Sequence, residues 1–164
     1  MHTMTDRAEL MKRFRTAATA FMDTVDSCSQ LEREAFLTNV SRSMAELYGV
    51  ALSLPPVKPD TSGTDELPLP IDKWDELRQS LKERIGSIDA YWKIFDSTEK
   101  EEPVQGSLAG DISEIYFDLK QSLRLEETRI SKSDLLFDWR LDFRSHWGRH
   151  LLGALAAIHH RYIE

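Results

Sequence analysis

Two histidines in the segment HWGRH, residues 146–150, are the side chains of this sequence whose spacing most directly suggests chemistry. His146 and His150 are four residues apart, which places them on one face of a helix. Imidazole pairs with this spacing hold metal ions in helical enzymes, and a histidine beside a carboxylate also serves as a general acid or base. The same pair can equally be structural.

Candidate partners for the histidines come from a second predicted helix, residues 108–128. Asp111 and Asp118 lie seven residues apart along one border of its apolar stripe, with Glu114 somewhat further out. Tyr116 lies on the opposite border. If this helix packs against the one that carries the histidines, Asp–His hydrogen bonds or a shared ion satisfy groups that are costly to bury.

The helix that carries the histidines is predicted over residues 131–162, and its apolar residues form a broad stripe. At 100° per residue, both histidines fall among aromatic and alanine side chains, so we expect them to be buried. Asp142 lies at the edge of the same stripe, one turn before His146.

Three interpretations of these residues remain open. The one we favour is a structural polar network between the two helices, made of His146, His150, Asp111, Asp118, Asp142 and Tyr116. The second is a divalent transition metal, with ligands drawn from His146, His150, Asp111, Glu114 and Asp118. The third is acid–base or phosphoryl chemistry by a His/Asp pair without a metal.

Established metal signatures are incomplete in this chain. The zinc-protease pattern His-Glu-x-x-His fails because Trp147 stands where its catalytic base belongs. Carboxylate-bridged di-iron bundles need Glu-x-x-His on two helices, and the sequence has none.

Composition restricts the class of protein. The chain has 164 residues, 41% hydrophobic and 30% charged, which fits one soluble globular domain over 1–164. Its formal charge of −7 argues against nucleic-acid binding, because phosphate recognition needs an excess of cations. A single cysteine, Cys28, excludes an intrachain disulfide, and no segment resembles a signal peptide or a membrane span. We therefore expect a cytoplasmic protein.

Helical periodicity predicts an all-α fold, an antiparallel bundle of about five helices. The predicted helices span 5–27, 30–52, 72–95, 108–128 and 131–162. Gly86 marks a bend in the third helix, and Ser107 and Ser131 are the predicted N-caps of the last two. A proline-rich connection, 53–70, joins the second and third helices, and an acidic loop, 96–106, follows the third. No stretch alternates long enough to predict a strand.

A second apolar side of the last helix, which includes Leu141 and Leu152, suggests contact with a partner subunit. We therefore expect a non-enzymatic binding or interaction module, as a homodimer or with a protein partner. The alternative is a metal-dependent, hydrolase-like enzyme that uses the histidine and acidic cluster.

Three segments of the C-terminal half resemble a known family. They are "AYWKIFD" at 90–96, "GSLAGDISEIYFDLK" at 106–120 and "DWRLDFRSHWGRHLLGALAAIHH" at 138–160. They are similar to an uncharacterised family of bacterial all-helical domains of unknown function, and the resemblance is strongest over 90–160. It implies a compact helical cytoplasmic protein and no assigned activity. The chain departs from the family pattern at Gly110 and at Glu114, where a longer carboxylate replaces a shorter one.

Overall fold

Helices make up most of the chain, as the periodicity predicts. The computed structural model describes residues 4–61, 71–94, 96–128 and 131–162. The helices are α1 (Met4–Asp26), α2 (Arg33–Leu52), α3 (Ile71–Ile85), α4 (Leu108–Thr128), α5 (Lys132–Asp142) and α6 (Gly148–Tyr162). Short 3-10 turns lie at Cys28–Gln30 and Gly86–Ile88.

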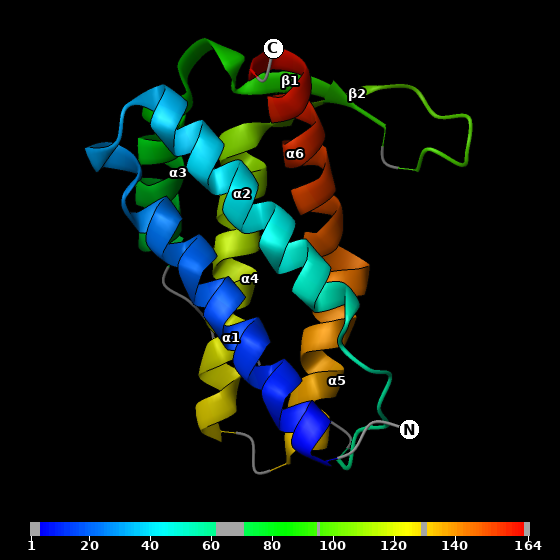
Figure 1. The fold of residues 1–164 in the computed structure, drawn as a ribbon. Coiled ribbons are helices and arrows are strands. Elements are labelled where there is room, and N and C mark those ends of the chain that lie inside the picture. The colour runs from blue at the N-terminus through cyan, green and yellow to red at the C-terminus, as the bar shows by residue number, and fades with distance from the viewer. Residues whose placement is uncertain (1–3, 62–70, 95, 129–130, 163–164) are drawn as a thin grey trace.

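The helices form an antiparallel bundle in which α4 holds the central place. α1 and α2 pack side by side, and α4 lies behind them with contacts to α1, α3 and α6 (Figure 1). The predicted all-α bundle is therefore confirmed. Within the described residues, no helix has both the length and the apolar character that a membrane span requires.

The core joins the two ends of the chain through aromatic side chains. Phe14 of α1 stacks on Trp139 of α5, with ring centroids 4.6 Å apart. The indole N–H of Trp139 donates to the carbonyl of Ser122 in α4, at 3.0 Å. Trp139 and Trp147 are both fully buried. Because large aromatic side chains bury the most apolar area, these contacts fix how the last helix lies across the bundle.

Both predicted N-caps are formed. The Ser107 hydroxyl accepts from the backbone N–H of Gly110 at 3.0 Å. The Ser131 hydroxyl accepts from the N–H groups of Ser133 and Asp134, at 3.1 and 3.3 Å. These bonds satisfy N–H groups that have no partner within the helix, which explains why α4 and α5 begin where they do.

The prediction of a third helix over 72–95 is wrong in its last turns. α3 ends at Ile85, and Gly86 follows with a φ of +66°, a conformation that side-chain-bearing residues rarely adopt. The chain then forms a β-hairpin, with β1 (Ala90–Lys93) antiparallel to β2 (Val104–Ser107). Each strand has four residues, too few for alternation to distinguish it from a helix turn. Phe95 lies outside the described residues.

The hairpin and its tip form an arm, which we define as residues 90–94 and 96–107. The arm leaves the bundle beside α6 and projects sideways (Figure 1). The predicted acidic loop, 96–106, forms the exposed tip, and its last three residues belong to β2. Of the predicted connection 53–70, residues 62–70 lie outside the described part of the chain.

A single π turn, Phe143–Trp147, joins α5 to α6, so the last predicted helix is continuous but not regular. The backbone N–H of Gly148 donates to the carbonyl of Phe143, five residues earlier. A Cβ at position 148 would lie 2.4 Å from that carbonyl oxygen. The π turn therefore requires glycine at this position.

We predict opposite effects for two glycine substitutions. Gly148→Ala forces its Cβ onto the Phe143 carbonyl, so the free energy of unfolding should fall by about 1 to 3 kcal/mol. Gly49→Ala is the matched control, since Gly49 is exposed in α2 and an added Cβ meets nothing within 4 Å. It should stabilise the protein by about 0.5 kcal/mol. Urea unfolding measures both, and equal effects would contradict the role of Gly148.

Candidate functional site

Asp111, in the first turn of α4, receives donors from two other elements. Its side chain is 4% exposed. His150 Nδ1 of α6 lies 2.7 Å from Oδ1, and Lys93 Nζ of β1 lies 2.9 Å from the same oxygen. The Tyr91 hydroxyl donates to Oδ2. Burial by itself would raise the pKa of Asp111, but the hydrogen bonds from His150, Tyr91 and Lys93 outweigh it and lower the pKa. Asp111 is therefore a buried, ionised carboxylate.

The hairpin brings two of these donors to one face. Tyr91 and Lys93 are two residues apart on β1, so their side chains point the same way. Gly153 of α6 makes room for the tyrosine, because a Cβ there would lie 2.7 Å from the Tyr91 hydroxyl oxygen. Burial, together with the hydrogen bond to Asp111, raises the pKa of Tyr91, which keeps its proton available for donation.

His146, in the π turn before α6, forms a second pair with Asp118, which lies seven residues after Asp111 on α4. His146 Nδ1 lies 2.5 Å from Asp118 Oδ2, and the two side chains are 47% and 26% exposed. Burial raises the pKa of Asp118 in spite of the hydrogen bond from His146. The expectation that both histidines are buried is wrong for His146. It lies within the π turn, where the ideal 100° per residue no longer gives its direction.

Asp142 lies near the second pair. The Ser122 hydroxyl donates to Asp142 Oδ2 at 3.3 Å. Burial, with the charges of Asp118 and Asp138, raises the pKa of Asp142 to about 6. Asp111 and Asp118 therefore each contact one histidine, and Asp142 interacts electrostatically with Asp118 and His146.

The structure places Tyr116 and Glu114 differently from the other predicted residues. The Tyr116 hydroxyl donates to Asp26 Oδ1 at 2.8 Å and accepts from Lys120 Nζ at 3.2 Å. Tyr116 thus joins α4 to the end of α1 and does not join the histidines. Glu114 lines a cleft beside Asp111 and His150, but among the described residues it forms no hydrogen bond with either histidine.

No cluster of three or more His, Cys, Asp or Glu side chains within the described ranges is placed to hold one ion. The reason is geometric, since each histidine faces its own carboxylate through Nδ1 and these carboxylates are seven residues apart on α4. The predicted ligand set of histidines and carboxylates therefore does not converge on one point.

Tyr91 and Lys93 were not predicted as site residues. Their segment was expected to be helical, and on a helix two residues that are two apart point in different directions. The available signal was the strand-like Tyr-x-Lys spacing, which a four-residue strand is too short to make distinctive.

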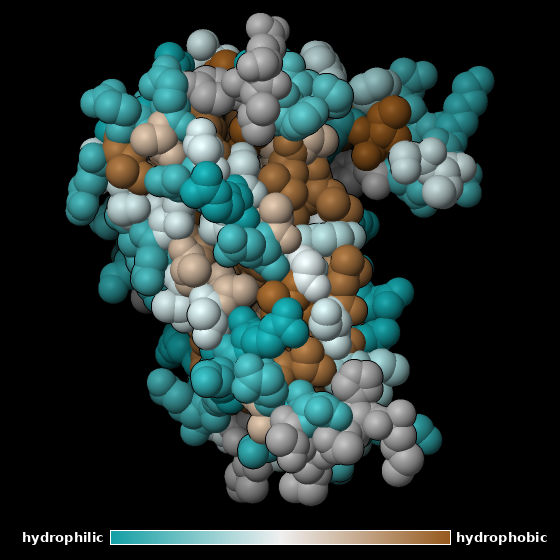
Figure 2. All heavy atoms as spheres, in the orientation of Figure 1, coloured by the Kyte–Doolittle hydropathy of each residue, from teal (hydrophilic) through white to brown (hydrophobic). Residues whose placement is uncertain are grey.

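A groove lies between the arm and α6, on the outer side of His150; we call it the arm groove. Figure 2 shows apolar side chains on the arm and along α6, on either side of this hollow. The groove is lined by Tyr91, Trp92, Lys93, Ile94, Ser97, Arg149, His150, Leu152, Gly153, Ala156, Ala157, His160 and Arg161. Basic and apolar residues therefore dominate it, and among the described residues none that lines it is acidic.

The fold and these features define a class: a helical bundle with a β-hairpin arm and an Asp–His layer. We define this layer as the pairs Asp111–His150 and Asp118–His146, which join α4 to α6 and to the π turn before it. The chain belongs to the family described as "Domain of unknown function (DUF5063)", which matches residues 5–164. The resemblance to an uncharacterised domain family is therefore confirmed. The fold is similar to that of protein BF1032 from Bacteroides fragilis, whose crystal structure matches with a TM-score of 0.78 at 20% identity over 94% of each chain. The search of curated proteins gives no match.

We predict that the charge of Asp142 destabilises the folded protein at neutral pH. The folded state holds the Asp142 proton more tightly than the unfolded chain, so stability falls as pH rises from about 4 to about 6. Asp142→Asn should therefore raise the free energy of unfolding by about 1 to 2 kcal/mol at neutral pH and leave it unchanged near pH 4.

Asp75→Asn, at an exposed position of α3, is the matched control and should change stability little at either pH. Thermal and urea unfolding across this pH range measure both variants. An Asp142→Asn protein that is no more stable than wild type at neutral pH would overturn the prediction.

Proposed function

We propose that this protein is a non-enzymatic, cytoplasmic binding module that takes an acidic, apolar-bearing segment of a partner protein into the arm groove. The observation that carries the proposal is the composition of the groove. Exposed apolar side chains and cations line it together, and the part of its wall that the structure describes contains no Asp or Glu.

The apolar part of the groove is unusually exposed. Trp92 is 69% exposed, and Ile94 and Leu152 are each 47% exposed. Large exposed apolar side chains that lie close together favour a role in contact, and tryptophan and arginine are the residues most often dominant in protein interfaces. A partner that covers Trp92 would gain the binding energy of a large aromatic surface.

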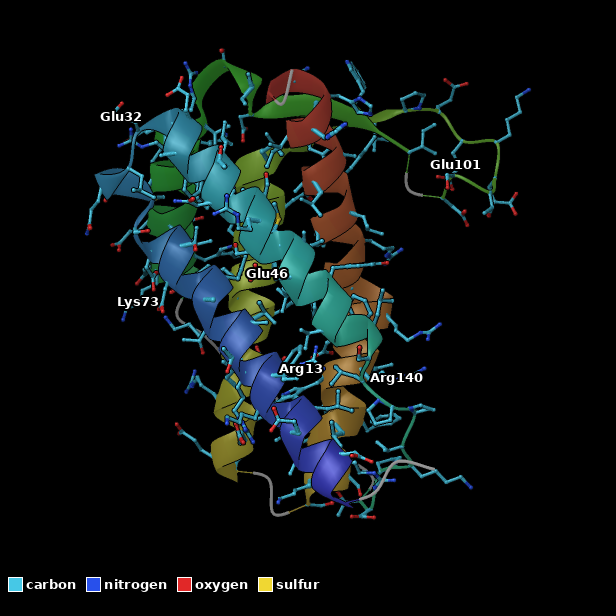
Figure 3. All side chains as sticks on the ribbon, in the orientation of Figure 1. Arg13, Glu32, Glu46, Lys73, Glu101 and Arg140 are labelled. Carbon is cyan, nitrogen blue, oxygen red and sulfur yellow. The ribbon has the colours of Figure 1, made fainter. Side chains whose placement is uncertain are left out.

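The charged side chains of the groove are positive, whereas the net charge of the whole chain is negative. The chain carries 28 Asp and Glu against 21 Lys and Arg, yet Arg149 and Arg161 line the groove, and within the described part of the chain no residue of its wall is acidic. An adjoining hollow shares Arg149 and Leu152, and its described lining residues include no acidic one either. Its further cations are Arg140 and Arg144, and Figure 3 labels Arg140 on α5. This segregation of charge favours an acidic partner.

A protein segment fits this chemistry better than a nucleic acid. The formal charge of −7 repels a polyanion at long range, whereas a short acidic segment meets mainly the local field of the groove. The exposed Leu152 and Ile94 also call for apolar side chains, which a phosphate backbone lacks.

The metal-dependent hydrolase alternative receives no support from the donor set. Catalytic zinc sites use three protein ligands, and the described residues bring no three such side chains together. The Asp–His layer instead supports the structural part of the proposal, in which His150 and Asp111 hold the arm and α6 in place around the groove.

The test uses a fluorescent synthetic peptide with leucines on one helical face and glutamates on the other. We expect it to bind, and Arg149→Glu or Trp92→Ala should weaken its affinity about tenfold or more. Lys73→Glu is the matched control, because Lys73 is an exposed cation on α3, away from the arm (Figure 3). Fluorescence anisotropy measures the affinity, and the control should match the wild type.

Two results would overturn the proposal. One is equal affinity for a peptide in which lysine replaces every glutamate; the other is unchanged affinity in the Arg149 and Trp92 variants. Light scattering tests whether a second copy of this chain fills the groove. A dimer that Arg149→Glu dissociates would mean that the occupant is a second copy and not another protein.

A further inference from the structure

The two histidines of the Asp–His layer, His146 in the π turn and His150 in α6, each have a second ring nitrogen with no hydrogen bond among the described residues. His146 and His150 have ring centroids 5.0 Å apart with their planes inclined at 74°. Their side chains are 47% and 23% exposed, so solutes can reach both rings.

Each histidine uses one nitrogen on a carboxylate. His146 Nδ1 faces Asp118 and His150 Nδ1 faces Asp111. An ionised carboxylate can only accept, so we assign a proton to each Nδ1, which leaves Nε2 as the ring nitrogen available to an ion. This is the arrangement in which a carboxylate orients a metal-binding histidine from outside the coordination sphere.

The two rings are closer together than the carboxylates that they contact. Asp111 and Asp118 are about 10 Å apart along α4. The histidine ring centroids are only 5.0 Å apart. The Nδ1 edges therefore point to different acceptors, and a shared ion requires the Nε2 edges to face each other.

We propose that His146 and His150 together bind one late divalent transition metal ion, such as Zn²⁺, through Nε2, with Asp118 and Asp111 as outer-sphere partners and water in the remaining positions. Zinc–imidazole bonds are about 2.1 Å long, so two rings that share a tetrahedral ion have centroids about 5 Å apart. The observed 5.0 Å agrees with this separation. Imidazole nitrogen is a ligand that suits this group of metals.

The charge around the rings also favours a cation. Asp111, Asp118 and Asp142 lie nearby, and Lys93 neutralises only part of their charge. This site differs from the one that the sequence predicts, because the carboxylates orient the histidines and do not ligate the ion. It needs two side-chain ligands, and it does not depend on the arm groove.

Calorimetric titration of the untagged protein with Zn²⁺ tests the proposal. We expect one ion per chain, and His146→Ala should weaken binding about tenfold or more. Asp118→Ala keeps both ligands but removes the acceptor of His146, so it should keep the stoichiometry and weaken binding about tenfold. Because His146 is half exposed and has one carboxylate partner, both variants should keep the wild-type circular dichroism spectrum.

The double variant His159→Ala, His160→Ala is the matched control. It removes two neighbouring, exposed histidines of α6 that lie outside the proposed site. It should bind Zn²⁺ like the wild type. Three results would overturn the proposal: no Zn²⁺ binding by the wild type, unchanged affinity in folded His146→Ala, or loss of binding in the His159 and His160 control.

Discussion

The buried carboxylate of Asp111 is the constraint on which the placement of the arm and α6 against α4 depends. A carboxylate removed from water is stable only when donors replace its hydration, and three do so here. His150 comes from α6, whereas Tyr91 and Lys93 come from β1, so one anion ties the arm and the last helix to α4. The position of the arm groove follows from the same tie, because its two walls are the arm and α6.

Local backbone geometry decides how the two Asp–His pairs differ. The π turn that Gly148 permits leaves Trp147 fully buried while His146 reaches solvent. His150, one turn further on, stays closer to the core and meets the more deeply buried carboxylate. The Asp111–His150 pair therefore stabilises the fold, whereas the Asp118–His146 pair is open to solutes. Exposed ion pairs such as the second contribute little to stability.

Much of this could be predicted from the sequence, for identifiable reasons. Helix ends at Ser107 and Ser131 follow from local capping chemistry, and the association of α4 with the last helix follows from their complementary polar residues. The arm could not be predicted, because four-residue strands carry too little pattern. For the same reason, Tyr91 and Lys93 were missed, and the π turn misdirected the prediction for His146, since ideal helical angles assume a regular helix.

The unfolding free energy of Asp111→Ala, compared with that of Asp118→Ala, tests whether the buried Asp111 carboxylate holds the arm and the last helix to α4. Removal of Asp111 leaves Lys93, Tyr91 and His150 without their shared acceptor, so the loss should be about 3 to 5 kcal/mol. Asp118→Ala removes the acceptor of a half-exposed histidine and should cost less than about 1 kcal/mol. An Asp111→Ala protein as stable as Asp118→Ala would contradict the account.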